Sequence, residues 1–308
     1  MELAEQEVPR PQLRIASNLV NLLAPGDMLL LKREGRGRRS LYGIFGHVVL
    51  VADVPRIGHE KKDYVPSALK EMSKAIGVGN DVVEVWMVRV LESTQGRRGV
   101  HWYTAALAVL PSSPGLWMFG ELRDKGKWVT ISPPRRFEIL QAPARARCQM
   151  ASPKALETFK TACIDTKNAT RATPTSNWSL RTAVVSFFLS PFQARLRKTP
   201  RPDALRGHWA VPPICTSVCI EAWQRFLLAS AATDAQGCDS IIDVVPCRAD
   251  RTLPRTFLQL LKQRGWRRVT DLPLFFVPCD VSPQLRPSSA ADETALASPE
   301  SDYLLWGE

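Results

Sequence analysis

The sequence has no apolar run long enough to cross a bilayer. A transmembrane helix needs roughly 18 consecutive apolar residues, whereas the run TAVVSFFL has only eight. The first residues, MELAEQEVPRPQLR, carry acidic side chains and lack the basic-then-apolar order of a secretory signal peptide. We therefore expect a cytoplasmic protein with no transmembrane segment.

Cysteine pairs and histidines at metal-ligand spacing are also absent. The seven cysteines are scattered and include no CxxC pair, and none of the four histidines stands at zinc-ligand spacing. The pattern indicates neither a disulfide framework nor a metal site, and nothing in the sequence implies a cofactor. Free thiols in a reducing compartment fit this pattern best.

Acidic residues are outnumbered along most of the chain. The net charge is +11, but residues 287–308 contain five acidic residues and no Lys or Arg, so the remainder carries +16. Basic residues gather at 32–39 and 194–206. These clusters are either solvated loops or a surface for an anionic partner. They lack the interleaved aromatic residues of a nucleic-acid site.

Predicted strands precede most of the predicted helices. Apolar, β-branched segments bounded by turn residues predict strands at 28–33, 47–53, 82–92, 99–110, 116–122, 127–131 and 137–141. Helical patterns follow at 152–163, 214–229 and 252–265. Strands first and helices after, with little alternation, favour an α+β fold.

The sequence pattern predicts one main domain. It spans 18–278, after an N-terminal segment at 1–17. A basic insertion at about 145–205 interrupts it. The Ser/Ala/Pro-rich, acidic residues 279–308 are expected to form a disordered tail.

The stretch PPICTSVCIEAWQRF, residues 212–226, carries the most informative thiol. Pro212 and Pro213 preset the backbone for a helix start, which places Cys215 beside the first backbone N–H groups and the positive end of the helix dipole. These surroundings lower a thiol pKa from about 8.5 toward neutrality, and the same N–H groups can hold an oxyanion. Cys219, one turn later, shares a face with apolar residues and is expected in the core.

A nucleophilic thiol needs a base and a group that orients the base. His47 opens the run HVVLVAD, so it stands at a strand end, where it either reaches a cleft or simply binds a backbone carbonyl. His208, seven residues before Cys215, is a second candidate. Glu92 closes an apolar strand face; it either orients the histidine or is a solvated carboxylate at the start of the turn ESTQG.

The order of these segments resembles the circularly permuted papain-like hydrolases related to the NlpC peptidases, the YiiX-like family. Members open with Gly-Asp and an apolar strand, here GDMLLL, followed by Gly or Ser before a His and a strand, here GHVVLVAD. A strand that ends in an acid and soon reaches Gly-Val follows, here VLESTQGRRGV, and the nucleophile comes late, here in CTSVCIEAW. The segment PRTFLQLLKQRGWRRV is similar to the family's last helix and strand.

The resemblance covers about 25–145 and 205–270 and has two departures. Thr216 stands where the family commonly has Ser, and Val218 with Cys219 replaces a larger apolar pair. Residues 145–205 have no clear counterpart in the family, so the sequence does not define a substrate groove.

The resemblance implies a permuted papain-like (NlpC-type) fold, with an antiparallel sheet or small barrel packed against a nucleophile-bearing helix. It also implies a thiol hydrolase, a cysteine peptidase or amidase without a cofactor, in which Cys215 is the nucleophile, His47 the general base and Glu92 the orienting residue. The substrate would be a peptide, another amide or a lipid ester. A lipid-directed acyltransferase or phospholipase on the same fold, or a catalytically inactive binding module, remains an alternative.

Overall fold

The computed structural model describes most of the segments to which the sequence assigns regular structure. The described residues are 13–17, 19–32, 47–58, 82–94, 99–110, 113–123, 127–171, 215–233, 241–249, 252, 254–269, 272 and 274–278. His208, Pro212, Pro213, the basic cluster at 194–206 and the tail at 279–308 lie outside them, as does all of the cluster at 32–39 except Lys32.

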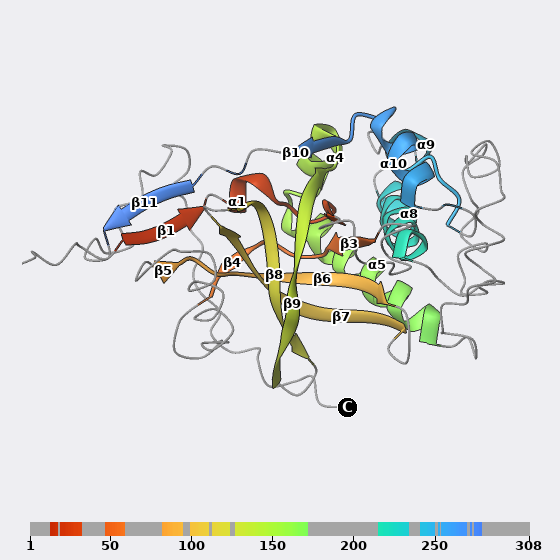
Figure 1. The fold of residues 1–308 in the computed structure, drawn as a ribbon. Helices are drawn as coiled ribbons and strands as arrows, with labels where there is room; N and C mark the ends of the chain where they lie inside the picture. The colour runs from red at the N-terminus through yellow and green to blue at the C-terminus, as the bar shows by residue number, and fades with distance from the viewer. Residues whose placement is uncertain are drawn as a thin grey trace, which may run out of the picture.

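Six antiparallel strands form a closed barrel (Figure 1). They are β2 (Met28–Leu31), β3 (Val48–Val51), β6 (Trp86–Thr94), β7 (Gly99–Leu110), β8 (Ser113–Arg123) and β9 (Lys127–Gln141). They pair in the order β9–β2–β3–β6–β7–β8, and pairing of β8 with β9 closes the ring. The predicted α+β class and antiparallel barrel are confirmed.

Short strands extend this barrel and form a second sheet. The strand β10 (Arg267–Val269) pairs with β9, and β4 (Arg56–Ile57) pairs with β6. In the second sheet, β1 (Leu13–Ser17) pairs antiparallel with β11 (Leu274–Pro278) and parallel with β5 (Val82–Val83). The sequence pattern did not predict β1 or β11.

The barrel strands present their side chains alternately to two cores, as the two-residue period of a strand requires. One core fills the barrel and includes Val49, Val88 and Val90. The other lies on the outer face, where Leu50 and Leu91 pack against helices. The apolar run at 47–53 is buried on both faces, which explains its lack of alternation.

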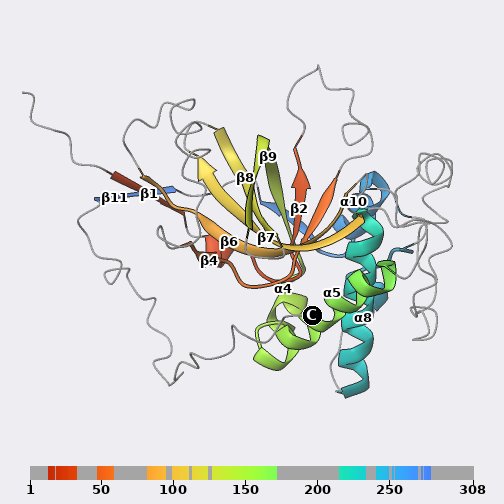
Figure 2. The ribbon, with the colours of Figure 1, turned by 90° about the horizontal axis from the view of Figure 1, so that it is seen from below.

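Helices cover one outer side of the barrel (Figure 2). The described helices are α1 (Leu19–Leu22), α4 (Ala144–Gln149), α5 (Pro153–Arg171), α8 (Cys215–Thr233), α9 (Ile241–Val244) and α10 (Pro254–Lys262). The helix α8 packs against β3, β6 and α5. Within the part of the chain that the structure describes, no helix has both the length and the hydropathy needed to cross a membrane.

An aromatic cluster joins the helices to one another and to the barrel. Phe159 of α5 lies edge-to-face against Trp223 and Phe226 of α8, with ring centroids 5.5 and 5.4 Å away. Trp223 also packs edge-to-face on Trp266, at 5.7 Å, and donates its indole N–H to the carbonyl of Gly26 at 3.0 Å. These contacts hold α8 in place relative to the start of β2.

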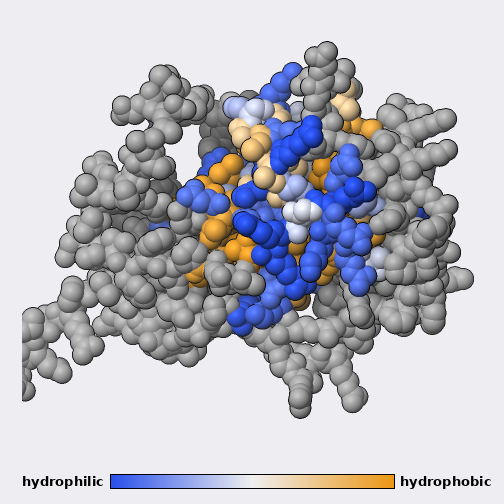
Figure 3. Space-filling view, turned by 90° about the horizontal axis from the view of Figure 1, so that it is seen from above, coloured by the Kyte–Doolittle hydropathy of each residue, from blue (hydrophilic) through white to orange (hydrophobic). Residues whose placement is uncertain are grey.

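The surface of the described residues is mainly polar on the face drawn in Figure 3. Among those residues, the exposed large hydrophobic side chains are Val20, Val54 and Ile164. They stand on different segments, and single exposed hydrophobic side chains are ordinary on a protein surface in water.

Two of the predicted strands, 127–131 and 137–141, are parts of one strand, β9. Its first half pairs with β8 alone, whereas its second half pairs with β2, β8 and β10. Between the halves lie Pro133 and Pro134, opposite a register shift in β8 between Met118 and Gly120. Proline has no N–H to donate, so it is tolerated in a strand at such an irregularity.

Candidate functional site

Three residues from distant parts of the chain meet where α8 begins against the barrel. His47 directly precedes β3, Glu92 belongs to β6 and Cys215 is the first residue of α8. All three are buried, with exposed fractions of 3%, 1% and 8%. His47 Nε2 lies 2.6 Å from Glu92 Oε1, and the Cys215 thiol is near enough to the His47 imidazole to raise its pKa.

The pairing of β3 with β6 explains why His47 reaches Glu92. Leu50 pairs with Leu91 and Val51 with Val90, so continuing the register places Glu92 opposite Val49. His47 lies two residues before Val49 and on the same strand face. The two side chains are therefore diagonal neighbours, a separation that long side chains bridge.

Two further side chains bind the Glu92 carboxylate. Arg135 of β9 donates from Nη1 to Oε1 at 2.7 Å, and the hydroxyl of Tyr103 of β7 donates to Oε2. Neither residue was predicted from the sequence. Strand alternation carries a signal for Arg135, because it shares the inward face of β9 with the core residues Phe137 and Ile139.

Hydrogen bonds and charge keep Glu92 ionised. Burial alone would raise the pKa of Glu92, but the hydrogen bond and charge of His47, with the charge of Arg135, lower it to about 2. Burial would likewise lower the pKa of His47, but hydrogen bonds with Cys215 and Glu92, together with their charges, raise it to about 9. At neutral pH the pair is therefore a carboxylate and an imidazolium.

The start of α8 supplies polar backbone groups beside the thiol. In any α-helix the first N–H groups have no acceptor within the helix, and they lie at the positive end of its dipole. Thr216 is buried and donates its hydroxyl to the carbonyl of Thr252, which fixes the first turn. The N–H groups around Cys215 are thus in position to bind a negatively charged oxygen.

The other described cysteines lie in different settings. Cys219 is fully buried in the outer core, as predicted, and burial raises its pKa well above the ordinary range. Burial also raises the pKa of Cys163 and Cys247. Cys148 is exposed. Cys215 differs from these four cysteines because its thiol raises the pKa of a histidine, His47.

The second histidine candidate, His208, lies outside the described residues. Another histidine, His101, is opposite Glu92 in the register of β6 and β7 and is partly buried. Within the described ranges, no three His, Cys, Asp or Glu side chains lie close enough to hold a metal ion.

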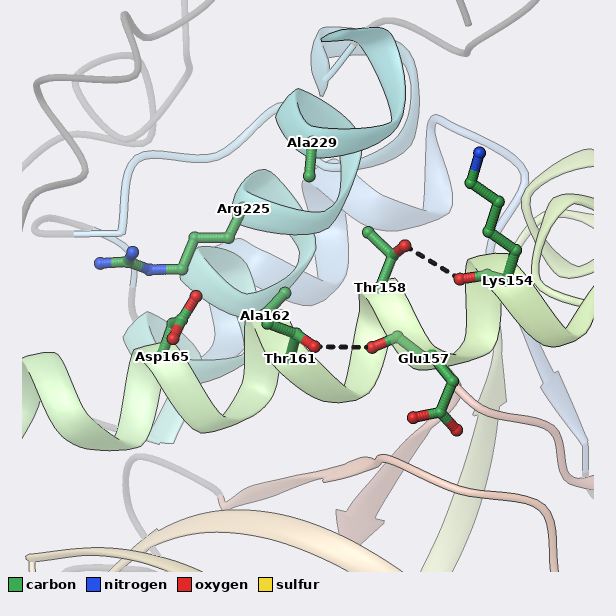
Figure 4. A pocket seen from close by; sticks show the side chains of 8 residues that line it. All are labelled: Lys154, Glu157, Thr158, Thr161, Ala162, Asp165, Arg225 and Ala229. Atoms are coloured by element: carbon green, nitrogen blue, oxygen red, sulfur yellow. Dashed lines mark hydrogen bonds between the residues drawn. The ribbon is translucent and has the colours of Figure 1, made fainter. Parts of the chain in front are cut away.

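A separate pocket lies between α5 and α8 (Figure 4). Its charged lining is Lys154, Glu157, Asp165 and Arg225. Two of its hydroxyls are already used within α5, because Thr158 donates to the carbonyl of Lys154 and Thr161 to that of Glu157. The pocket does not include Cys215, so we assign it no part in the chemistry of the thiol.

Comparisons with known proteins identify no family. The chain matches no protein-family model, no curated protein and no solved structure.

Proposed function

We propose that this chain is a thiol hydrolase, a cysteine peptidase or amidase that acts through Cys215, His47 and Glu92. The observation that carries the proposal is the buried hydrogen bond of His47 to Glu92, together with the influence of the nearby Cys215 thiol on the pKa of the same imidazole. A thiol, an imidazole and a group that orients it form the usual apparatus of nucleophilic catalysis by cysteine.

The proposed fold is the permuted papain-like, NlpC-type arrangement. Its support is the chain order, in which an antiparallel barrel that carries His47 and Glu92 precedes the helix that begins at Cys215. The resemblance to the YiiX-like family requires the same order of histidine, acid and cysteine. The peptidase and amidase activities of that kind of hydrolase are therefore the first to test.

In the first half of the reaction, the Cys215 thiolate attacks the carbonyl carbon of an amide or ester. A C–S bond forms, and the carbonyl oxygen becomes an oxyanion beside the first N–H groups of α8. The bond to the leaving amine or alcohol then breaks as His47 gives its proton to that group. Because Glu92 holds Nε2 of His47, Nδ1 is the ring nitrogen that would exchange this proton.

In the second half, water releases the acyl group. Neutral His47 takes a proton from a water molecule, whose oxygen attacks the acyl carbon. The C–S bond breaks, and the thiolate and imidazolium are restored. Glu92 keeps the imidazole oriented through both halves and stabilises its positive charge.

Selective alkylation of the full chain tests this function. At pH 6 we expect iodoacetamide to modify Cys215 ahead of the other cysteines, because the thiolate is the reacting species. Mass spectrometry of each peptide gives the rates. Cys148 is the internal control, since it is exposed whereas Cys215 is only 8% exposed, so faster labelling of Cys215 reflects chemistry rather than access.

Two variants complete this test. His47→Ala should slow the alkylation of Cys215, whereas Cys219→Ala, on the same helix, should leave it unchanged and lower stability by about 1 kcal/mol as a small core truncation. If Cys215 labels no faster than Cys148 and His47→Ala changes nothing, the proposal fails. Libraries of peptides, isopeptides and lipid esters, with Cys215→Ser as the blank, then identify the substrate class.

A further inference from the structure

The Glu92 carboxylate is surrounded by donors from three other segments of the barrel. Oε1 accepts from His47 and from Arg135, and Oε2 accepts from Tyr103. A protonated carboxyl would accept these bonds more weakly, because hydrogen bonds to an ionised acceptor are the stronger ones. The arrangement is therefore matched to the ionised form of Glu92 and to one orientation of its two oxygens.

His47 and Arg135 are the two cations that bind the Glu92 carboxylate. The titratable side chains near it come from every surrounding element: His47 before β3, His101 and Tyr103 on β7, Glu121 on β8, Arg135 on β9 and Cys215 on α8. In the proposed thiolate form, Cys215 and Glu92 are both anions. Of the described cations, His47 and Arg135 are the two whose charges lower the pKa of Glu92, so without Arg135 this carboxylate would depend on His47.

Arg135 is partly exposed to solvent, unlike the carboxylate that it binds. Its side chain is 31% exposed, whereas that of Glu92 is 1% exposed. A buried carboxylate needs charge-assisted donors to remain ionised, and Arg135 supplies one from β9, which lies opposite β6 in the ring of strands. Tyr103 is buried and supplies a neutral donor at the other oxygen. The two residues thus fix charge and orientation separately.

We propose that Arg135 and Tyr103 are positioning residues, which hold the Glu92 carboxylate ionised and oriented so that it binds the His47 imidazole. The effect on Cys215 rests on the proposed function above, but the effect on the bond between His47 and Glu92 does not. Neither residue needs to touch a substrate. Each acts on the reaction only through Glu92.

The first readout is the hydrogen-bonded Nε2 proton of His47, observed by NMR in the folded full chain. A short bond to a buried carboxylate shifts this proton far downfield and protects it from exchange with water. Arg135→Gln should move the resonance upfield or broaden it beyond detection. Tyr103→Phe, which removes one donor without changing charge or shape, should move it less. Arg135→Lys, which keeps the charge, should restore part of it.

The second readout is the rate at which iodoacetamide alkylates Cys215, measured from pH 4 to pH 9 with this probe alone. Removing a cation near the anionic cluster should slow this alkylation at pH 6, because a neighbouring positive charge favours the thiolate. Arg135→Lys should restore most of the rate. Arg136→Gln is the matched control, because Arg136 is the next residue on β9 and lies over the Trp117 ring, 5.9 Å from its centroid.

The two readouts separate failure of this inference from failure of the proposed function. If the downfield resonance of folded Arg135→Gln and Tyr103→Phe equals that of the unmodified protein, Arg135 and Tyr103 do not position Glu92, whatever Cys215 does. An equal change in Arg136→Gln would also overturn the inference. If the resonance changes as expected but Cys215 shows no selective labelling, the positioning stands and the thiol chemistry fails.

Discussion

At the scale of single residues, Glu92 shows how a buried charge is maintained. Transfer of a carboxylate from water to a protein interior is costly unless donors replace the lost hydration. Glu92 receives such donors from His47, Arg135 and Tyr103. The same bonds bias the partner, since the carboxylate favours the protonated form of His47. The two charges therefore depend on each other.

Replacing Glu92 should lower the pKa of its partner. Glu92→Gln keeps the shape but removes the negative charge, so the pKa of His47 should fall from about 9 toward its ordinary value of 6.5. An NMR titration of the histidine ring carbons measures the change. Glu138→Gln is the control, because Glu138 pairs with Lys32 and Arg268 rather than with His47. A His47 midpoint that stays near 9 in Glu92→Gln would contradict the assignment.

The residues of the site differ in how far the sequence could predict them. Cys215 and His47 stand at the start of an element and Glu92 near the end of β6, each next to a clear apolar pattern in the sequence, so local patterns single them out. Arg135 lies within a polar stretch that also contains Arg136. Only closure of the barrel, through pairing of β8 with β9, brings Arg135 to Glu92. That pairing joins segments whose partners no local pattern specifies.

At the scale of elements, the turn before β2 fixes how closely α8 approaches the barrel. Gly26 has a φ of +87°, a backbone conformation that side chains disfavour. A Cβ at Gly26 would lie 2.2 Å from Met150 Cε and 2.5 Å from Trp223 Cζ2. The glycine of the sequence GDMLLL therefore serves both the turn and the packing of α8.

Two glycine variants separate these effects. Gly26→Ala should lower the free energy of unfolding by about 2–4 kcal/mol, from a left-handed backbone and a steric clash together. Gly265 has a φ of +80°, but a Cβ there would lie 4.0 Å from Pro143 Cβ, without a clash. Gly265→Ala should therefore lower the free energy of unfolding through backbone strain alone, by about 1 kcal/mol. Urea unfolding of both variants measures the difference. Equal losses would show that packing against Trp223 is unimportant.

Elements that are set by local sequence signals were predicted more accurately than elements that depend on contacts between distant segments. The strand predicted at 99–110 is β7 with the same bounds, because its apolar residues and flanking turns are local signals. The helix predicted at 152–163 extends to Arg171 in the structure. Its later turns hold polar residues, so the sequence pattern weakened there, while packing against α8 continues along the helix. The joining of two predicted strands into β9 likewise depends on distant partners.

At the scale of the whole molecule, three buried groups link stability to pH with known signs. The pKa of Asp27 is raised, mainly by burial, from 3.8 to about 7. Its stabilising effect is therefore full below 3.8 and is lost as pH rises through 7. His47, raised from 6.5 to about 9, loses its effect as pH rises through 9. Glu92, lowered from 4.5 to about 2, loses its effect as pH falls through 2.

The contacts of Asp27 explain why its contribution to stability depends on pH. The Asp27 carboxylate accepts from the backbone N–H groups of Ala24 and Ala142, at 2.8 and 2.7 Å, and so joins the turn before β2 to the end of β9. The guanidinium of Arg147 lies 3.5 Å away. Ionisation of this buried group is only partly compensated. His47 and Glu92, by contrast, compensate each other.

The protein should therefore be more stable in mildly acidic than in alkaline solution. We expect the free energy of unfolding, measured by urea at several pH values, to be highest near pH 4, where the gain from Glu92 ends and the loss from Asp27 begins, and to fall toward pH 9. The combined loss from Asp27 and His47 should be on the order of a few kcal/mol. Asp27→Asn should flatten the decline between pH 4 and 7, and Asp53→Asn, which removes a partly buried partner of Lys160, is the control. A profile that rises steadily from pH 5 to 9 would show that neither buried group governs the stability of the fold.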